Sequence, residues 1–149
     1  MKKLLAWSPV FEIGIPIIDE QHQKFIEMIA EIQNNILTAS RENLIRFFSF
    51  IYDYMIYHFK AEEILMVEYQ YPEIEEHIEE HREFKEKIDF FYESFKKNNT
   101  QFIIVNIIDF MKDWIIGHLL SSDKAFGEWY NCYYSTDKKE ALKPQAKCS

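Results

Sequence analysis

Five histidines and several carboxylates recur at helical spacing along this chain of 149 residues. His58 and Glu62 are four residues apart, and so are His77 and His81. Side chains four apart on an α-helix point the same way, so each pair can hold one ion between its members. Surface helices produce such pairs by chance, so a metal site is indicated only where the pairs lie inside the protein.

All five histidines and Glu62 fall on apolar stripes that step by three and four residues, the pattern of buried helix faces. In chain order the four stripes carry His22, then His58 with Glu62, then His77 with His81, and finally His118. A single buried histidine is usually a hydrogen-bonded core residue. Each buried imidazole without a hydrogen-bond partner destabilises the fold by about 1–3 kcal/mol. Five of them would cancel much of a typical free energy of unfolding of about 5–15 kcal/mol. Bound metal is the simplest compensation.

Asp123 is a further candidate ligand, because it follows His118 by five residues. On a regular helix of about 3.6 residues per turn, the two side chains diverge by about 140°. Asp123 therefore joins the site only if the helix is distorted there. Otherwise it is a solvated residue at a helix end.

Four helices with short connections are predicted to position these side chains. Asp19 is the expected N-cap of the first helix, and Ser40 is the expected N-cap of the second. The predicted helices span about 19–38, 41–69, 73–97 and 101–120. The predicted fold class is all-α, an antiparallel up-down-up-down four-helix bundle.

The whole chain, 1–149, is predicted to be one domain. Its parts are an irregular N-terminal arm (1–18), the bundle (about 19–123) and a short C-terminal extension (about 124–149). Phe126 and Trp129 in that extension, with Tyr130, Tyr133 and Tyr134, are expected to pack against the bundle.

The composition supports a helical domain and excludes several functions. With 48% apolar residues, only 3 Gly and 4 Pro, the chain is neither disordered nor a many-stranded β protein. The net charge of −8 and the lack of a basic cluster argue against a nucleic-acid partner. No apolar stretch is long enough to cross a membrane. Cys132 and Cys148 lack CxxC spacing, so we expect reduced thiols, no thiolate metal site and a cytoplasmic protein.

Imidazoles and carboxylates without thiolates favour iron, zinc or manganese over calcium or magnesium. Five nitrogens are too many for one tetrahedral zinc, so two ions that share bridging carboxylates fit better. The ferritin-like class is excluded, because no histidine here has a glutamate three residues before it. The segment His77–His81 also matches H-x-x-E-H, the signature of inverted zinc peptidases, with Glu80 as general base.

The sequence resembles the hemerythrin family, in particular its single-domain bacterial members, over about residues 7–125. The matching segments are Trp7, Gly14-Ile15, Asp19-Glu20-Gln21-His22, His58-Phe59-Lys60-Ala61-Glu62-Glu63, His77-Ile78-Glu79-Glu80-His81, and Trp114-Ile115-Ile116-Gly117-His118 followed by Asp123.

This resemblance implies a pair of non-haem irons, joined by an oxygen bridge, that binds O₂ reversibly. By motif, one iron is held by His77, His81 and His118, the other by His22 and His58, and Glu62 and Asp123 bridge them. The iron with two histidines then keeps one open position. O₂ is the expected partner, for storage, delivery or scavenging, and the protein is not expected to be an enzyme. No protein partner is indicated.

A dry pocket around the O₂ position would disfavour the release of a charged oxygen species. The candidates for its lining lie within one helical turn of an expected ligand and are Ile115, Trp114, Phe25 and Phe59. Ile115, one turn before His118, is the best single candidate.

Other functions stay open at this point. They are an O₂ or redox sensor that acts through a partner, a diiron enzyme that handles peroxide or nitric oxide, the zinc peptidase, and a structural bundle without metal. An acidic band is interpreted as a solvated face, with docking of a cationic partner as the alternative. Its members are Glu63, Glu68, Glu73, Glu75, Glu76, Glu79, Glu80, Glu83 and Glu86.

Overall fold

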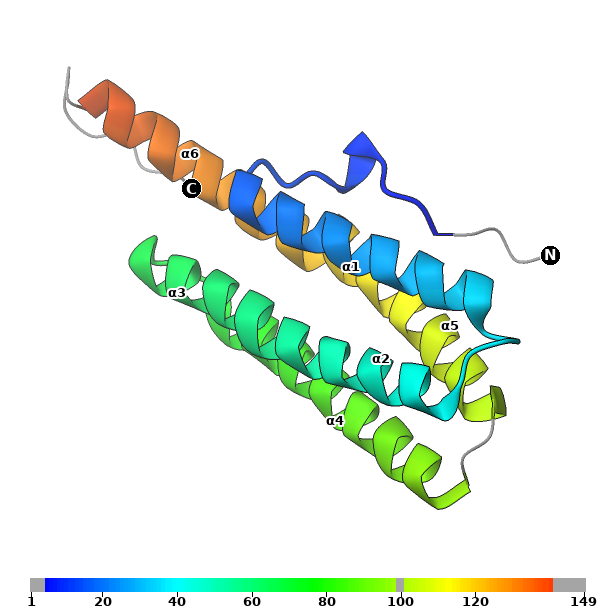
Figure 1. Ribbon diagram of the computed structural model, residues 1–149. Helices are drawn as coiled ribbons and strands as arrows, with labels where there is room; N and C mark the ends of the chain where they lie inside the picture. Colours follow the sequence, from blue (N-terminus) through cyan, green and yellow to red (C-terminus); the bar gives the residue numbers. More distant parts are fainter. Residues whose placement is uncertain (1–4, 99–100, 141–149) are drawn as a thin grey trace.

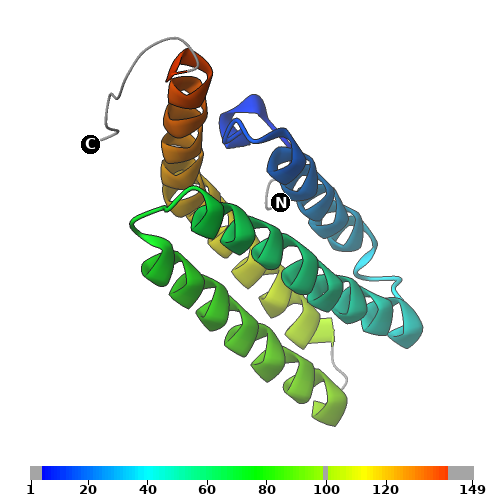
Figure 2. The same ribbon diagram turned by 90° about the vertical axis from the view of Figure 1, so that its left-hand side faces the viewer.

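A computed structural model describes residues 5–98 and 101–140, and every regular element in them is helical. The described residues form four helical rods that lie side by side (Figures 1 and 2), which confirms the prediction of a helical bundle. The first rod is α1 (Pro16–Asn35), and the third is α4 (Ile74–Asn98). The second rod joins α2 (Arg41–Tyr54), the π-helical turn η2 (Met55–Phe59) and α3 (Lys60–Glu68). The fourth rod joins α5 (Gln101–His118), the π-helical turn η3 (Leu119–Asp123) and α6 (Lys124–Glu140).

The N-terminal arm contains one short 3₁₀ helix, η1 (Pro9–Phe11), and is tied to the start of α1. The helix begins at Pro16, with Ile15 as its N-cap, so the prediction that Asp19 is the N-cap is wrong. The Asp19 carboxylate instead accepts hydrogen bonds from the backbone N–H groups of Ile13 (2.7 Å) and Gly14 (3.1 Å). Gly14 has a φ of 83°, a left-handed conformation that glycine adopts without strain, and this turn leads the arm into α1.

The other helix boundaries agree with the prediction at some ends and not at others. Ser40 is the N-cap of α2, and its hydroxyl accepts a hydrogen bond of 3.2 Å from the N–H of Asn43. The first helix ends at Asn35, three residues before the predicted end at Thr38. The fourth rod does not stop near residue 120, because η3 continues the helix directly into α6.

The predicted C-terminal extension is therefore a helix over its described part, and its aromatic residues pack on the bundle. Phe126 is fully buried, and its ring lies 5.2 Å from that of Tyr71. The Trp129 indole donates a hydrogen bond of 3.0 Å to the backbone carbonyl of Tyr69. Tyr134 remains 41% exposed. Residues 141–149, the end of the predicted extension, lie outside the described residues.

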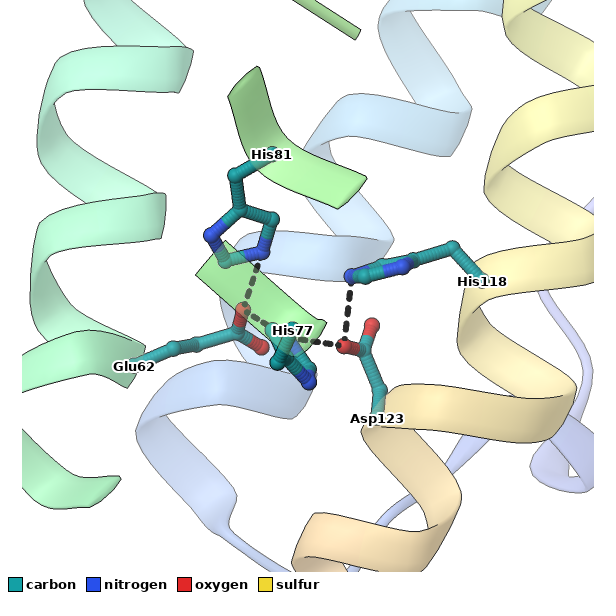
Figure 3. A group of neighbouring side chains, drawn as sticks. All are labelled: Glu62, His77, His81, His118 and Asp123. Carbon is teal, nitrogen blue, oxygen red and sulfur yellow. Dashed lines mark hydrogen bonds and ion pairs between the residues drawn. The ribbon is translucent and has the colours of Figure 1, made fainter. Parts of the chain in front are cut away.

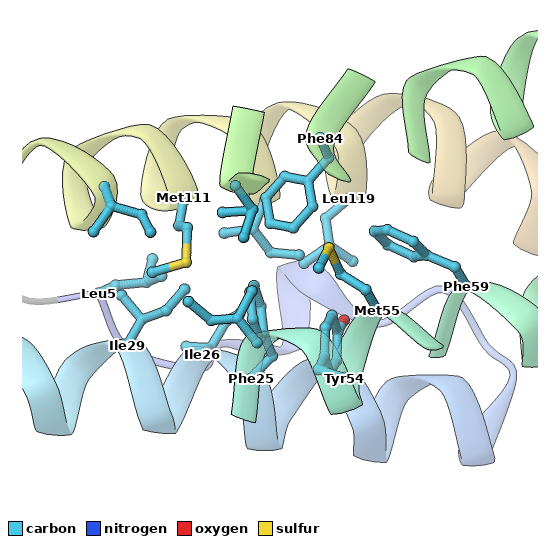
Figure 4. Packing of buried hydrophobic residues seen from close by; sticks show 14 of the residues in the cluster. Leu5, Phe25, Ile26, Ile29, Tyr54, Met55, Phe59, Phe84, Met111 and Leu119 are labelled. Carbon is cyan, nitrogen blue, oxygen red and sulfur yellow. The ribbon is translucent and has the colours of Figure 1, made fainter. Parts of the chain in front are cut away.

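An apolar core fills the space between the rods, and Figure 4 shows part of it. Phe25 and Ile29 from α1, Phe84 from α4 and Met111 from α5 are all fully buried there. Close packing of this kind fixes the rotation of each rod about its own axis. It therefore determines which side chains meet at the level where the histidines lie.

Two further sequence predictions concern the cysteines and membranes. The prediction of reduced thiols is wrong at Cys132, which is disulfide-bonded, whereas Cys148 lies outside the described residues. No helix in the described part of the chain is both long enough and apolar enough to cross a membrane.

Candidate metal centre

Seven buried side chains from all four rods meet in the interior, and Figure 3 shows five of them. α1 supplies His22, the second rod supplies His58 and Glu62, α4 supplies His77 and His81, and the fourth rod supplies His118 and Asp123. Each is at most 4% exposed. Every residue that the sequence predicted as a metal ligand thus lies in one cluster.

The donor atoms of these seven residues fall into two groups that share both carboxylates. Within each group, the atoms all lie within 4.8 Å of one another. The first, which we call the three-histidine group, contains His77, His81 and His118 with Glu62 and Asp123. The second, the two-histidine group, contains His22 and His58 with the same Glu62 and Asp123.

Each of the two carboxylates directs one oxygen toward the three-histidine group and the other oxygen toward the two-histidine group. Oε1 of Glu62 lies 3.5 Å from Nε2 of His58, and Oε2 lies 3.2 Å from Nε2 of His81. Oδ2 of Asp123 lies 3.2 Å from Nε2 of His22, and Oδ1 lies 2.9 Å from Nε2 of His118. This is the arrangement in which a carboxylate can bridge two cations.

The π-helical turn η3 explains how Asp123 reaches the cluster. A π-helical turn closes i to i+5 hydrogen bonds, so residues five apart lie on one face. His118 precedes η3, and Asp123 is its last residue. The helix distortion that the sequence analysis required for Asp123 is therefore present. A second π-helical turn, η2, carries His58.

The cluster contains buried polar atoms that the described residues leave without hydrogen bonds. These atoms are Oε1 of Glu62, both carboxylate oxygens of Asp123, and Nε2 of His81 and of His118. Such atoms, desolvated and facing one another, are costly unless a cation binds between them. Five imidazoles and two carboxylates without a thiolate are also a donor set suited to iron, zinc or manganese. The residues present therefore fit a pair of divalent cations.

Without a cation, protons would compensate the charges of this cluster. Burial lowers the pKa of His22, but the Asp123 and Glu62 carboxylates outweigh burial and raise that pKa to about 9. The same balance of burial against the two carboxylates raises the pKa of His77 to about 9 and that of His118 to about 10. His58 differs, because its burial prevails and lowers its pKa to about 3.

The two carboxylates stay ionised in these surroundings. Burial disfavours the charged form of Glu62, but the nearby imidazoles, His58 first among them, hold its pKa well below the usual range. Burial and the negative charge of Glu62 both oppose the ionisation of Asp123, but His118 and His22 hold its pKa low as well.

Outer partners of the histidines are the functional residues that the sequence analysis missed. Nδ1 of His58 lies 2.8 Å from the amide oxygen of Gln21, and Nδ1 of His81 lies 3.2 Å from a carboxylate oxygen of Glu63. Nδ1 of His118 likewise lies beside Glu80. Glu63 and Glu80 belong to the acidic band interpreted as a solvated face; both are partly exposed, but each also contacts a histidine of the cluster, which that interpretation does not predict. Their positions next to Glu62 and His81 in the sequence were the available signal.

Aromatic rings cover the histidines of the cluster. Phe59 stacks on His81, with centroids 3.8 Å apart and planes at 5°, and Trp114 stacks on His118 at 4.3 Å and 17°. These two candidates for an O₂ pocket thus lie against the three-histidine group. Phe25 stacks on Tyr54 at 4.0 Å, and Tyr54 in turn stacks on His58 of the two-histidine group at 4.6 Å.

The fold, the shared carboxylates and the histidine spacing define a class of protein. The chain belongs to the hemerythrin family, because residues 13–130 match the family model of the hemerythrin HHE cation binding domain.

Similar proteins include a bacteriohemerythrin of Stenotrophomonas maltophilia, 26% identical over 137 residues that cover 92% of this chain and 88% of that protein. A bacteriohemerythrin of Methylococcus capsulatus is 23% identical over 125 residues, covering 83% of this chain and 95% of its own length. A hemerythrin-like protein of Naegleria gruberi is 25% identical over 120 residues, covering 80% of this chain and 88% of its own.

Proposed function

We propose that the protein binds O₂ reversibly at a pair of non-haem irons, for storage, delivery or scavenging of oxygen. The single observation that carries this proposal is that Glu62 and Asp123 are shared by a three-histidine and a two-histidine group. With the two shared carboxylates and one oxygen bridge, a cation held by three histidines would have six donors and one held by two histidines would have five, which leaves one position open for a small ligand. The proposed scaffold is an antiparallel up-down-up-down four-helix bundle, the arrangement that the sequence predicts.

In this proposal, His77, His81 and His118 hold one iron, and His22 and His58 hold the other. Glu62 and Asp123 bridge the two irons. When bound, the pair of irons supplies the electrons and the open position needed for reversible binding of O₂. The side chains of this chain hold the irons, exclude water and line the position of O₂.

The apolar side chains around the cluster exclude water from it. Ile115 and Phe25 are fully buried, and Phe59 is 7% exposed. Tyr54 and Trp114, stacked on His58 and His118, shield the faces of those two rings. We propose that Ile115, one turn before His118, lines the position of O₂.

The small number of buried acidic and basic side chains around the site favours binding of O₂ over catalysis. In the described part of the chain, the seven proposed ligands are the only buried Asp, Glu, His, Lys or Arg side chains. Tyr54 is also buried, but its burial raises the pKa of its hydroxyl well above the usual value, which makes it a poor acid. With the ligands occupied by metal, no further buried carboxylate or imidazole there can transfer protons to a substrate.

The zinc-peptidase alternative gains no support from the position of Glu80. As a general base, Glu80 would have to face a water molecule on the ion held by His77 and His81. Its carboxylate instead lies behind His118, against the outer nitrogen Nδ1 of that ring.

The first test is metal content, together with absorption spectra of the anaerobically reduced protein before and after admission of air. Two irons per chain, with a band that appears in air and disappears when O₂ is removed, would support the proposal. Irreversible bleaching would instead favour a sensor or an enzyme. One zinc per chain without a response to O₂ would overturn the proposal.

A matched pair of variants ties the result to the shared carboxylate. Asp123→Ala removes a proposed bridge, and we expect it to lower the iron content below two per chain. Asp113→Ala changes an exposed aspartate on α5 and should retain both irons. Equal iron contents in the two variants would contradict the assignment of Asp123.

A further inference from the structure

Three of the five histidines are held from outside by a residue that directly follows or precedes a proposed ligand on a neighbouring rod. Gln21, next to His22, accepts from His58 (2.8 Å). Glu63, next to Glu62, lies 3.2 Å from Nδ1 of His81. Glu80, next to His81, lies 2.5 Å from Nδ1 of His118. Each of these three residues thus orients a proposed ligand on another rod.

The two groups differ in the charge of these outer partners. The three-histidine group has two carboxylates behind it, those of Glu63 and Glu80. The two-histidine group has only the neutral amide of Gln21. Nδ1 of His22 and Nδ1 of His77 have no hydrogen-bond partner among the described residues. The negative charge outside the ligands is therefore concentrated at one of the two cation positions.

Glu80 makes the most elaborate of these contacts. The Ser122 hydroxyl lies 2.7 Å and 2.8 Å from its two carboxylate oxygens, so Ser122 holds the carboxylate while His118 donates to it. His118 directly precedes η3, and Ser122 lies within it, one residue before Asp123. The Glu80 carboxylate on α4 thus contacts both the residue before the π-helical turn, His118, and a residue near its end, Ser122, next to Asp123.

The chemistry of imidazole gives this contact a direction. A neutral imidazole carries one N–H, so a ring whose Nδ1–H donates to a carboxylate presents the lone pair of Nε2 to the cation. A carboxylate acceptor also makes the ring a stronger electron donor than an amide acceptor does. Both effects strengthen cation binding at the group that has the carboxylates.

We propose that Glu80, held by Ser122, is a positioning residue that orients His118 and makes the three-histidine position bind its divalent cation more tightly and fill first. This inference rests on the proposed function only in that the centre binds two divalent cations, and it does not depend on O₂. Loss of such an outer partner typically weakens metal binding about 10–100-fold. The side chain of Glu80 is 41% exposed, so solvent screens its charge, and we expect about 10-fold.

The test is an anaerobic titration of the metal-free protein with Co²⁺, against a competing chelator. Wild-type protein should bind two ions in two steps of unequal affinity. Glu80→Gln keeps the shape of the side chain but removes its charge, and it should weaken the tighter step about 10-fold while the weaker step stays as in wild type. Ser122→Ala should give a smaller loss in the same step, and Glu80→Asp should retain part of the affinity.

Glu76→Gln is the matched control. Glu76 also lies on α4 and directly precedes a histidine, His77, but it is exposed and has no contact with the outer nitrogen of any described histidine. It should leave both steps unchanged. A second measurement, the NMR signal of the His118 Nδ1–H in protein loaded with Zn²⁺, should shift in Glu80→Gln and not in Glu76→Gln.

The outcomes separate this inference from the proposed function. Two Co²⁺ steps that are identical in wild type and Glu80→Gln would overturn the inference and leave the proposed function standing. Equal losses in Glu80→Gln and Glu76→Gln would also overturn it, because the effect would then be one of overall charge. A wild-type protein that binds no divalent cation would overturn both.

Discussion

The Nε2 atoms of His22 and His58 lie 3.0 Å apart, on rings that are at most 1% exposed. At this separation the two nitrogens can share one proton, but both cannot carry one without strong repulsion. Burial, with a smaller contribution from the charge of His22, lowers the pKa of His58 to about 3. Burial also opposes protonation of His22, but the Asp123 and Glu62 carboxylates outweigh it and raise the pKa of His22 to about 9. Without a cation, the protonation of this pair and of its neighbours, and with it the stability of the fold, depends on pH.

The metal-free protein should lose stability at alkaline pH. His22, His77 and His118 have folded-state pKa values of about 9, 9 and 10, above the ordinary value of 6.5. Their contribution to the free energy of unfolding is therefore complete below pH 6.5 and is lost as the pH rises through 9 to 10. Urea unfolding of metal-free protein near pH 7 and near pH 10 measures this loss. Metal-loaded protein is the control and should lose less.

On the acid side, His58 should have the opposite effect. Its folded-state pKa of about 3 lies below 6.5, so its contribution is present above pH 6.5 and falls as the pH drops toward 3. The pKa values of Glu62 and Asp123 are also lowered, so their contributions are lost as the pH falls. Stability of the metal-free protein should therefore be greatest between these limits. A stability that is flat from pH 5 to pH 10 would contradict both predictions.

Metal binding should release protons near neutral pH. Cation binding requires unprotonated imidazoles, whereas the raised pKa values of His22, His77 and His118 keep these rings protonated in metal-free protein at pH 7. The apparent affinity for Zn²⁺ should therefore rise with pH between 7 and 9. Calorimetric titrations in buffers with different ionisation enthalpies count the protons, and an observed enthalpy that is the same in every buffer would refute the prediction.

Ile115→Ala tests the proposed O₂ pocket. We expect the O₂ affinity or the rate of autoxidation of the loaded protein to change, because the variant enlarges the space one turn before His118. Ile104→Ala, on the same helix and equally buried, is the control. Each truncation should cost about 2–5 kcal/mol of stability, but only Ile115→Ala should alter the reaction with O₂. Ile115→Val is the milder variant to use if alanine prevents folding.

Two glycines in the fourth rod should respond to alanine with opposite signs. A Cβ at Gly127 would lie 2.8 Å from Cβ of Ile13 in the N-terminal arm, whereas a Cβ at Gly117 would meet nothing within 4 Å. Gly117→Ala should therefore stabilise the protein by about 0.5–1 kcal/mol through helix propensity. Gly127→Ala should destabilise it by about 1–3 kcal/mol, because the arm must move away from α6. Thermal unfolding of the two variants decides this, and a gain in stability for both would contradict the contact with Ile13.

Periodicity alone was enough to predict the helical bundle and to bring the histidines together. A stripe that steps by three and four places His77 and His81 on one face whatever the neighbouring rods do. The start of α1 was misplaced at Asp19 because aspartate is a strong N-cap, although Pro16 at the first helical position was the better signal. Asp19 has a tertiary partner in the arm, which local rules do not consider.

The outer partners of the histidines and the π-helical turns could not be predicted from local sequence, because tertiary packing determines them. Glu76 and Glu80 lie four residues apart on the same face of α4, so only the position of α4 along its axis relative to α5 decides which of them meets Nδ1 of His118. The sequence of the η3 turn carries no local signal for a π-helical turn, because contacts at the site and in the core determine that conformation. Asp123 was therefore placed correctly only on the condition of a helix distortion that the sequence did not predict.

The η3 turn also has a consequence far from the cluster, because it shifts the helical phase of the rest of the fourth rod. Deleting one residue from it, such as the exposed Leu120, would rotate everything that follows by about 100°. Lys124, Gly127 and Asn131 hold the arm at Glu12 and Ile13, and all three follow the turn. The same turn therefore sets both the direction of the Asp123 carboxylate and the face of α6 that receives the arm. A one-residue change in chain length at this turn would disturb two distant surfaces together, whereas substitution of the exposed Leu120 side chain would leave the phase intact.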